Sequence, residues 1–277
     1  AFRIMQDEIL KNFAQHIFYH GTSYYGAKNI FNKRFREGHG ILGSGVYITS
    51  NWLVAVWIIY HNEFLSDVSY KFRGGGAILR VNISKGTRIL NSTIKPDSKC
   101  LQYLRKEFGK DILNKHPRKV IPKNKRLTQR EFINLFRYHY WKTHEKNKRR
   151  SDDLPHSFMY YLNQSAGTSK RVNFHWRLLN DLMTDLRVQY QFDGFGNPED
   201  DLGIVIFEGN RLEVKEFVFG FNFIDDVNDF EEWLNPNSPM RCLFPDVDHL
   251  RKYFQKHGSR EAKELAKQIA TAEKKKL

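Results

Sequence analysis

The sequence predicts an α+β fold that a basic helical segment interrupts. Three observations lead to this prediction: strand and helix patterns alternate over the first hundred residues, a helical and strongly basic segment follows, and strands return from residue 188. The chain has 277 residues, of which 40% are hydrophobic and 14% aromatic. That composition is sufficient for a packed core.

The N-terminal residues 1–16 are expected to form an amphipathic helix, with Phe2, Met5, Ile9 and Phe13 along one face. After it, the period of the apolar residues predicts strands at 17–22, 45–50, 74–84 and 87–91, and helices at 23–33 and 51–64. Ser50 and Asn51 form a helix-capping pair in front of the second helix.

The middle of the chain is expected to be helical and its end mixed. Helical patterns occur at 103–108, 130–141, 158–162 and 174–186, with a loop containing two prolines at 114–126. Strands are predicted at 188–195, 202–209 and 211–220, and helices at 227–234, at 246–256 and from 260. We therefore expect a single domain over 1–277, with a basic helical insertion at 101–187 and a basic helical C-terminal extension at 245–277.

Charge is segregated along the chain. The formal net charge is +14, but residues 101–150 alone carry 16 Lys/Arg and 4 Asp/Glu, net +12. Residues 151–250 carry 7 Lys/Arg and 18 Asp/Glu, net −11. A segment with this excess of cations indicates a polyanionic partner.

Several classes of protein are not expected. No apolar run reaches the roughly 18 residues that a membrane span needs, so no membrane partner is expected. Acidic residues interrupt the N-terminal apolar stretch, which does not resemble a secretory signal. Cys100 and Cys242 lie far apart and outside any metal-ligand spacing, which predicts a reduced cytoplasmic protein with no metal site.

Three stretches carry the chemistry: YHGTS at 19–23, GILGSGVYITSNWLVAVW at 40–57 and FDGFGNPEDDLGIVIFEGNRLEV at 192–214. In this order and spacing they resemble the ADP-ribosyltransferase superfamily. The closer likeness is to its histidine–tyrosine branch, which includes the poly(ADP-ribose) polymerases and the diphtheria-type toxins. The resemblance covers the first 85 residues and about 188–220. It implies a split β-sandwich fold and NAD-dependent mono-ADP-ribosyl transfer with release of nicotinamide.

Each residue type in these motifs suits one part of that reaction. Cleavage of the nicotinamide–ribose bond passes through an oxocarbenium-like sugar. The rings of Tyr47 and Trp57 can stack on nicotinamide, the backbone at His20 and Gly21 can read its carboxamide, and the His20 imidazole can bind a ribose hydroxyl. The NAD-binding residues that the resemblance implies are His20, Gly21, Thr22, Ser23, Gly45, Tyr47 and Trp57.

The sequence departs from the family at the catalytic carboxylate. Alignment of the third motif puts Gly203 or Leu202 where the family has glutamate. Asp201 lies two residues before Gly203, on the same strand face, so it is the first candidate to act with His20 and Tyr47. Asp200 and Glu199 are the next candidates, and Glu208 lies at the far end of the strand. A missing glutamate argues against chain elongation, because several mono-ADP-ribosyltransferases of the family also lack it.

Each of these residues has a structural alternative. A histidine at a strand end is more often a hydrogen-bonded structural residue, and Trp57 has the position of a helix-core aromatic. The acidic run at 199–201 can equally form a solvated turn. The first two motifs together favour the site reading for His20, and the alternatives for Trp57 and the acidic run stay open.

The basic segment predicts the acceptor. Its cations are interleaved with aromatic residues, the combination that binds single-stranded nucleic acid. The candidate nucleic-acid-binding residues are Lys119, Lys123, Lys125, Arg126, Arg137, Lys148, Arg149 and Arg150. One alternative is a solvated basic helix face with the aromatics in the core, and a second is a basic segment that offsets the acidic residues 151–250 within the fold. We therefore expect transfer to nucleic acid, with RNA favoured over single-stranded DNA.

Two other functions stay open. The first is mono-ADP-ribosylation of an acidic protein, and the second is an inactive fold that binds RNA. The arginine-rich site pattern of the related RNA 2′-phosphotransferases is not found. The resemblance also implies a toxin or antiviral defence effector, and hence an inhibitory protein partner such as an antitoxin.

Overall fold

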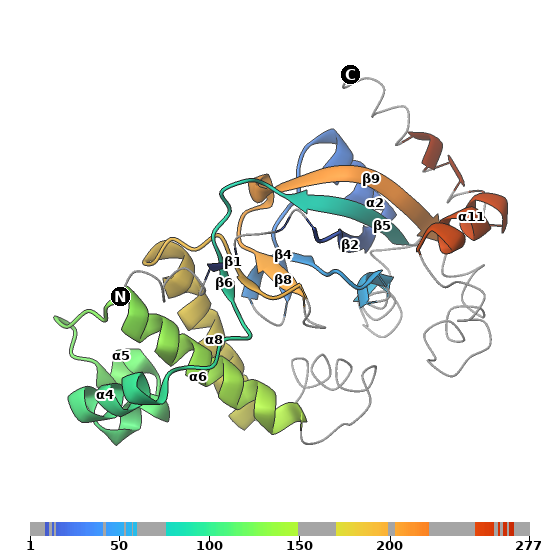
Figure 1. Ribbon diagram of the computed structural model, residues 1–277. Coiled ribbons are helices and arrows are strands. Elements are labelled where there is room, and N and C mark those ends of the chain that lie inside the picture. Colours follow the sequence, from blue (N-terminus) through green and yellow to red (C-terminus); the bar gives the residue numbers. More distant parts are fainter. Residues whose placement is uncertain are drawn as a thin grey trace. The chain divides into compact units, whose positions relative to one another are not determined.

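The computed structural model describes residues 9–10, 13, 15–40, 43–52, 54–56, 58–59, 76–148, 170–198, 203–221, 247–257, 260, 263–264 and 266–268 (Figure 1). Helices and sheets both occur, which confirms the predicted α+β class. The chain divides into two compact units. The sheet unit comprises 11–38, 45–87 and 198–277, and the helical unit comprises 1–10, 39–44 and 88–197.

The sheet unit contains a three-stranded antiparallel sheet with β5 (Gly76–Ile83) in the centre, between β2 (Phe18–Ser23) and β9 (Leu212–Phe221). In this register Gly21 lies opposite Ile78. The central strand is the most apolar, since Ile78 and Leu79 are fully buried. A strand buried in this way anchors the two strands that pair with it.

Two helices lie against this sheet. Helix α2 (Tyr24–Asn32) begins directly after β2 because the Ser23 hydroxyl accepts a hydrogen bond from the amide of Gly26 at 3.0 Å. Helix α11 (Val247–His257) lies at β9, as Figure 1 shows, and Arg251 Nη2 is 2.7 Å from Glu216 Oε1. Arg80 Nη1 reaches the same oxygen at 2.7 Å, so one carboxylate joins β5, β9 and α11.

A second strand pair belongs to the sheet unit from Gly45 onward. The strand β4 (Gly43–Ile48) follows β3 (Gly38–Gly40) and pairs antiparallel with β8 (Ile204–Ile206), which the 3₁₀ turn η3 (Gly209–Arg211) follows. A Cβ at position 45 would lie 2.5 Å from Val205 Cγ2. Glycine at this position therefore allows the close approach of the two strands.

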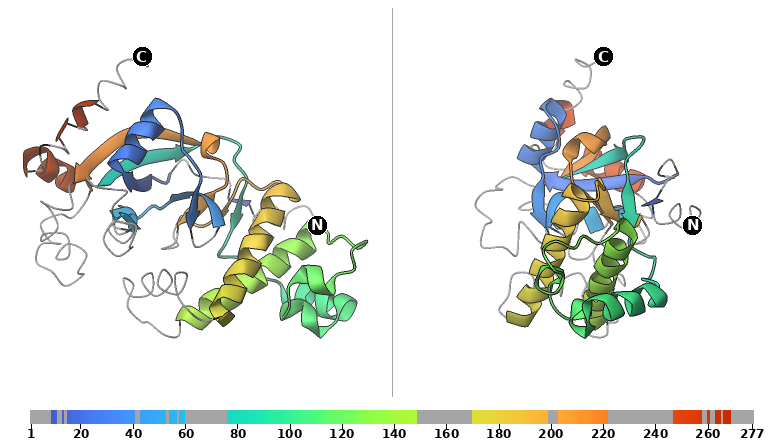
Figure 2. Two further views of the ribbon diagram at one scale, coloured as in Figure 1. Left: turned by 180° about the vertical axis from the view of Figure 1, so that it is seen from behind. Right: turned by 90° about the vertical axis from the view of Figure 1, so that its left-hand side faces the viewer.

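The helical unit has a small sheet in the order β1 (Ile9–Leu10), β6 (Ile89–Asn91) and β7 (Gly194–Gly196). Its helices are α4 (Ser98–Phe108), η2 (Lys110–Leu113), α5 (Pro117–Val120), α6 (Gln129–Lys148) and α8 (Lys170–Val188). Figures 1 and 2 show α6 and α8 side by side. The ring of Phe136 on α6 meets that of Phe195 edge-on at 4.8 Å, which joins the helices to the strands.

Local capping determines where these helices begin. The carboxylate of Asp97 accepts from the amide of Lys99 at 2.8 Å at the start of α4. Thr128 and Glu131 form a capping box at the start of α6, because each side chain accepts from the other residue's amide, at 3.0 Å and 3.3 Å. Both signals are readable in the sequence.

Most predicted elements are confirmed. In their described residues, they are the strands at 17–22, 45–50, 74–84, 87–91, 202–209 and 211–220, and the helices at 23–33, 51–64, 103–108, 130–141, 174–186 and 246–256. The patterns at 158–162 and 227–234 lie outside the described residues.

The strand predicted at 188–195 is wrong over most of its length. Helix α8 continues to Val188, and only Gly194–Gly196 is a strand. The alternation of Tyr190 and Phe192 with polar residues has another cause. The Tyr190 ring stacks on Phe132 of α6 at a centroid distance of 4.2 Å, and its hydroxyl donates to the carbonyl of Leu127. The apolar side chains of this segment therefore pack against a helix and do not form the face of a strand.

Two smaller predictions are also wrong. The predicted loop at 114–126 contains α5, which His116 caps and Pro117 opens at its first position. The predicted N-terminal helix is contradicted at Ile9–Leu10, which form β1 and pair with β6. A two-residue strand of this kind depends on its partner and leaves no period in the sequence.

Candidate functional site

His20 lies on β2 and is held by the backbone of β4. Its Nδ1 atom is 2.8 Å from the carbonyl oxygen of Tyr47. A carbonyl only accepts, so Nδ1 carries the proton and Nε2 is left as an acceptor. Burial lowers the pKa of His20 below its usual value, against the smaller effect of the Tyr47 hydrogen bond. The imidazole is therefore a neutral, oriented acceptor at neutral pH.

The two strands meet because their backbones bridge. The amide of Tyr19 donates to the carbonyl of Thr49 at 2.7 Å, and the amide of Thr49 donates to the carbonyl of Tyr19 at 3.0 Å. This bridge sets Tyr47, two residues before Thr49, beside His20. The Tyr47 side chain lies on the opposite face of β4 from Val46 and Ile48, which are buried.

Gly21 presents a backbone edge. Both backbone groups of Tyr19 point away from β5, toward Thr49. Along an antiparallel strand the backbone N–H and C=O groups of successive residues point to opposite sides. Gly21 lies two residues after Tyr19, so its N–H and C=O point to the same side as those of Tyr19. One donor and one acceptor on a single edge match a primary carboxamide.

Gly21 also has to be glycine for steric reasons. A Cβ there would lie 2.3 Å from the carbonyl oxygen of Ala55 and 2.9 Å from the side chain of Ile59. Residues 54–56, 58 and 59 are helical, and Ala55 is fully buried. This helical segment therefore contacts β2 beside the edge that Gly21 presents.

The structure gives Thr22 and Ser23 local roles at the start of α2. The Ser23 hydroxyl is the N-cap acceptor, and Ser23 is buried. A Cβ at Gly26 would lie 2.1 Å from Thr22 Oγ1, so the first turn of α2 rests on Thr22. Sequence reasoning placed both residues at NAD, and it did not separate the capping acceptor from a cofactor ligand.

Trp57 and the acidic candidates Asp201, Asp200 and Glu199 lie outside the described residues. Pro198, directly before the acidic run, and Gly203, two residues after it, are described, and both lie at the end of β4. The Ser50 hydroxyl donates to the carbonyl of Pro198. Gly203 has φ +66°, and a Cβ there would lie 2.1 Å from the carbonyl oxygen of Ile48. Residues at and just beyond the end of β4, the strand that carries Tyr47, therefore contact the chain on both sides of the acidic run.

Glu208, the remaining candidate, lies at the N-cap position of η3, beyond the far end of β8. Thr49 and Ser50 are the site residues that the sequence analysis missed. Ser50 was noted only as a helix cap, and no local signal identifies a carbonyl partner 148 residues away.

The candidate nucleic-acid residues fall into four groups: exposed and unpaired, paired, buried, and outside the described residues. Lys119, Lys123 and Arg126 are exposed and make no ion pair within the described part of the chain. Lys125 pairs with Glu107, and its ammonium lies 4.9 Å from the ring centroid of Phe108. A phosphate would therefore compete with the Glu107 carboxylate for Lys125.

Arg137 was predicted to bind nucleic acid, and its position in the structure contradicts this prediction. It is 1% exposed on α6, and its Nη2 donates to the carbonyl of Asn91 at 3.2 Å. A buried guanidinium that binds the backbone supports the fold and does not meet a phosphate. The side chain of Lys148, and Arg149 and Arg150 as a whole, lie outside the described residues.

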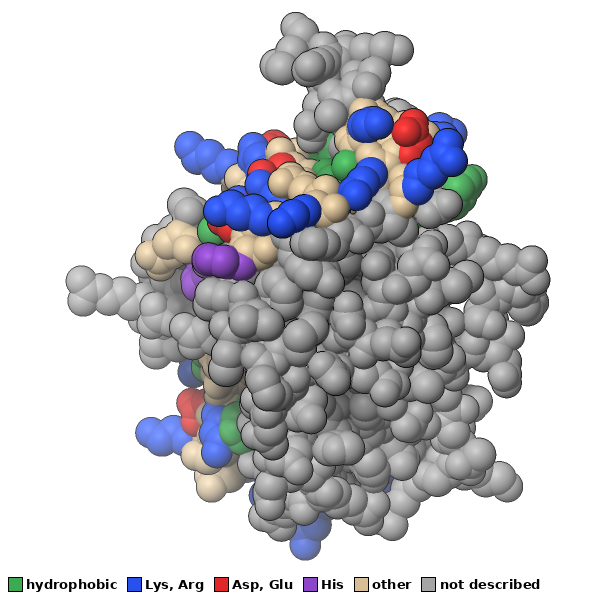
Figure 3. All heavy atoms as spheres, turned by 90° about the vertical axis from the view of Figure 1, so that its right-hand side faces the viewer, with side chains coloured by type: hydrophobic (Ala, Val, Ile, Leu, Met, Phe, Trp, Pro, Cys, Tyr) green, Lys and Arg blue, Asp and Glu red, His purple; other side chains and the backbone are tan. Residues whose placement is uncertain are grey.

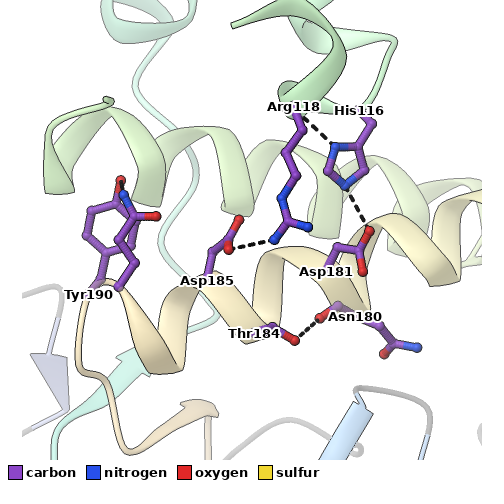
Figure 4. A network of polar contacts seen from close by, with 8 residues as sticks. His116, Arg118, Asn180, Asp181, Thr184, Asp185 and Tyr190 are labelled. Atoms are coloured by element: carbon purple, nitrogen blue, oxygen red, sulfur yellow. Dashed lines mark hydrogen bonds and ion pairs between the residues drawn. The ribbon is translucent and has the colours of Figure 1, made fainter. Parts of the chain in front are cut away.

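Other basic side chains of this segment hold helices together. Arg118 Nη2 is 2.8 Å from Asp185 Oδ1 on α8, and this contact raises the pKa of Arg118 (Figure 4). His116 Nε2 is 3.1 Å from Asp181 Oδ2 on the same helix (Figure 4). The acidic face of α8 thus neutralises part of the basic segment.

Lys and Arg side chains also gather along one edge of the face in Figure 3. The exposed cations of the C-terminal part include Lys252, Lys256, Arg260 and Lys263. They belong to the predicted basic extension, whose described residues from 260 are helical.

The described residues contain no group of three or more His, Cys, Asp or Glu side chains placed to hold a metal ion. Nor does any helix among them have the length and apolarity for crossing a membrane. Comparison with family models, with curated proteins and with solved structures finds no match to this chain.

Proposed function

We propose that this chain is a NAD-dependent mono-ADP-ribosyltransferase that modifies nucleic acid, with RNA as the favoured acceptor. The observation that carries the proposal is the hydrogen bond from His20 Nδ1 to the Tyr47 carbonyl, 2.8 Å long, beside the backbone edge of Gly21. The bond joins the first two of the three motifs on which the resemblance rests, and it orients the group that would contact ribose. The split β-sandwich assignment is part of this proposal.

The residues divide the work as follows. The N–H and C=O of Gly21 pair with the nicotinamide carboxamide, and the Tyr47 ring stacks on the nicotinamide. His20 Nε2 accepts a hydrogen bond from a ribose hydroxyl and so fixes the sugar. The bond between nicotinamide and ribose C1′ breaks, nicotinamide takes the bonding pair, and an acceptor oxygen or nitrogen bonds to C1′ and loses its proton.

A carboxylate completes this site by favouring positive charge on the sugar or by taking that proton. Asp201 is the first candidate and Asp200 and Glu199 the next. The anchoring of Pro198 and Gly203 at the end of β4 supports this assignment, because Tyr47 lies on that strand.

The charge of the helical unit supports nucleic acid as the acceptor. Lys119, Lys123 and Arg126 are exposed, and no described acidic side chain pairs with them. Exposed cations of this kind bind the phosphates of a nucleic acid whatever its base sequence. An acidic protein is the alternative acceptor, and the experiment includes it.

The test uses NAD⁺ labelled in its adenylate part, incubated with the full chain and purified RNA, single-stranded DNA or cell lysate. We expect label in RNA and one nicotinamide released per ADP-ribose transferred. His20→Ala should abolish both, whereas His16→Ala, the matched histidine outside the site, should retain them. Label found in protein alone would show that the acceptor is a protein and not a nucleic acid. No label and no nicotinamide would leave the inactive RNA-binding fold as the function.

A further inference from the structure

One face of α4 combines cations with an exposed aromatic ring. Lys99, Tyr103 and Lys106 are exposed and occur at spacings of four and three residues. At 100° per residue these three side chains lie within a stripe about 60° wide, and Leu104, on the other side, is fully buried. The stripe, called here the α4 stripe, spans about 10 Å at 1.5 Å per residue.

The ring of Tyr103 is exposed to solvent, and its hydroxyl lies near Glu131. Tyr103 is 46% exposed, the largest exposure of an aromatic side chain in the described part of the helical unit. The nearby Glu131 carboxylate raises the pKa of Tyr103, because it can accept from the hydroxyl and its charge disfavours the phenolate. Glu131 is itself fixed by the capping box of α6. A flat group can stack on an aromatic ring whose face lies in solvent.

The acidic residues around this stripe are all engaged. Residues 97–131 contain four, namely Asp97, Glu107, Asp111 and Glu131. Asp97 caps α4 and lies 3.7 Å from Arg130, Glu107 pairs with Lys125, and Asp111 pairs with Lys115 at 2.7 Å. None of them neutralises the stripe.

The cations are in excess. Residues 97–131 contain 11 Lys/Arg, so four acids leave a net charge of +7. The exposed cations for which the described residues supply no ion pair are Lys99, Arg105, Lys106, Lys110, Lys119, Lys123 and Arg126. This charge complements a polyphosphate, and an exposed ring favours one whose bases are unstacked.

We propose that the α4 stripe is a docking surface for single-stranded RNA, in which Lys99 and Lys106 contact phosphates and a base stacks on Tyr103. The proposal deepens the proposed function by naming where its acceptor binds, and it rests on that function only for the identity of the acceptor. A duplex does not fit the stripe equally well, because its bases are stacked on one another and present no face to Tyr103.

The test measures binding of the full chain to a fluorescent single-stranded RNA by anisotropy, without NAD⁺, over a series of salt concentrations. Tyr103→Ala should lower affinity about tenfold without changing the salt dependence, within the range of base–aromatic stacking. Tyr103→Phe, which keeps the ring, should retain most of the affinity. Lys99→Gln with Lys106→Gln should reduce the slope of log K against log salt by about 1.4 in magnitude, as expected for two phosphate contacts with a single strand.

The matched control is Lys115→Gln with Arg118→Gln, which makes the same change in net charge at cations that already have carboxylate partners. Its affinity should stay close to that of the unchanged chain, and melting temperatures check that every variant folds. Equal losses in the two double variants would mean that binding follows net charge, and would overturn the proposal. Tighter binding of duplex RNA or of single-stranded DNA than of single-stranded RNA would overturn it as well.

The two proposals fail separately. A chain that binds RNA through the α4 stripe but releases no nicotinamide contradicts the proposed function and leaves the docking surface intact. If the Tyr103→Ala variant labels RNA with the same KM for RNA as the unchanged chain, the proposed function stands and the docking surface is refuted.

Discussion

The imidazole of His20 donates to the backbone carbonyl of Tyr47 across 2.8 Å, although 27 residues separate them in the sequence. This contact settles the tautomer of His20 and joins β2 to β4 through a side chain, next to the backbone bridge of Tyr19 and Thr49. The contact with Tyr47 and the proposed contact with ribose therefore use different nitrogen atoms of the His20 ring, so substitutions can separate the two roles.

His20→Asn tests this separation. The Asn amide can replace Nδ1 as the donor to Tyr47 but places nothing at Nε2. We expect the variant to unfold within a few degrees of the unchanged chain and to release nicotinamide at least about 100-fold more slowly. His20→Ala should lose both, because it leaves a carbonyl without its donor, at about 1–3 kcal/mol. Thermal unfolding and nicotinamide release measure the two effects; an active His20→Asn would remove Nε2 from the mechanism.

Stability should depend on pH through His20. Its folded pKa is lowered by burial, so the unfolded chain, with a pKa near 6.5, takes up the proton first on acidification. The stabilising contribution is therefore fully present above pH 6.5 and is lost as the pH falls from there toward the folded pKa. Urea unfolding at several pH values measures it, with His20→Asn as the reference that lacks the group. Identical pH dependence in both proteins would contradict the prediction.

Gly21→Ala should destabilise the chain by about 1–3 kcal/mol, because its Cβ would lie 2.3 Å from the backbone oxygen of Ala55. NAD binding should weaken too, since β2 or the helical segment must shift. Gly38→Ala is the matched control: the nearest atom to its Cβ would be 3.9 Å away. Melting temperatures of the two variants give the comparison, and similar losses would show that close packing at Gly21 is not the cause.

Ser23→Ala should lose about 1 kcal/mol of unfolding free energy, because the amide of Gly26 loses its capping acceptor. Ser23→Asp supplies another acceptor and should restore most of that stability. Chemical denaturation measures both. A fall in NAD affinity in Ser23→Asp, at unchanged stability, would assign the hydroxyl to the cofactor in addition to the cap.

Arg137→Gln should lower the free energy of unfolding by about 2 kcal/mol or more, because the substitution removes a buried donor to Asn91. RNA affinity should be unchanged, since the residue is 1% exposed. Lys123→Gln, an exposed cation, should behave in the opposite way, with unchanged stability and weaker RNA binding. Denaturation and anisotropy together distinguish the two variants, and an RNA defect confined to Arg137→Gln would reverse the assignment.

Much of the fold was predictable because its signals are local. The caps at Ser23 and at Thr128–Glu131, and the period-2 pattern of β5, involve residues within a few positions of one another. The prediction failed at 188–195 because the same alternation serves helix packing: Tyr190 stacks on Phe132, which lies on another element.

The sequence by itself determined the α+β class, most elements, the excess of cations in 101–150 and the motifs around His20 and Tyr47. Only the tertiary structure decided how these residues are used. It joined His20 to Tyr47, placed Ala55 against Gly21 and buried Arg137. It also neutralised Arg118 with a carboxylate 67 residues away, while leaving Lys99, Tyr103 and Lys106 exposed. The partners in these contacts are far apart in the chain. Local sequence patterns do not show which distant residues meet, so they do not predict burial or charge pairing.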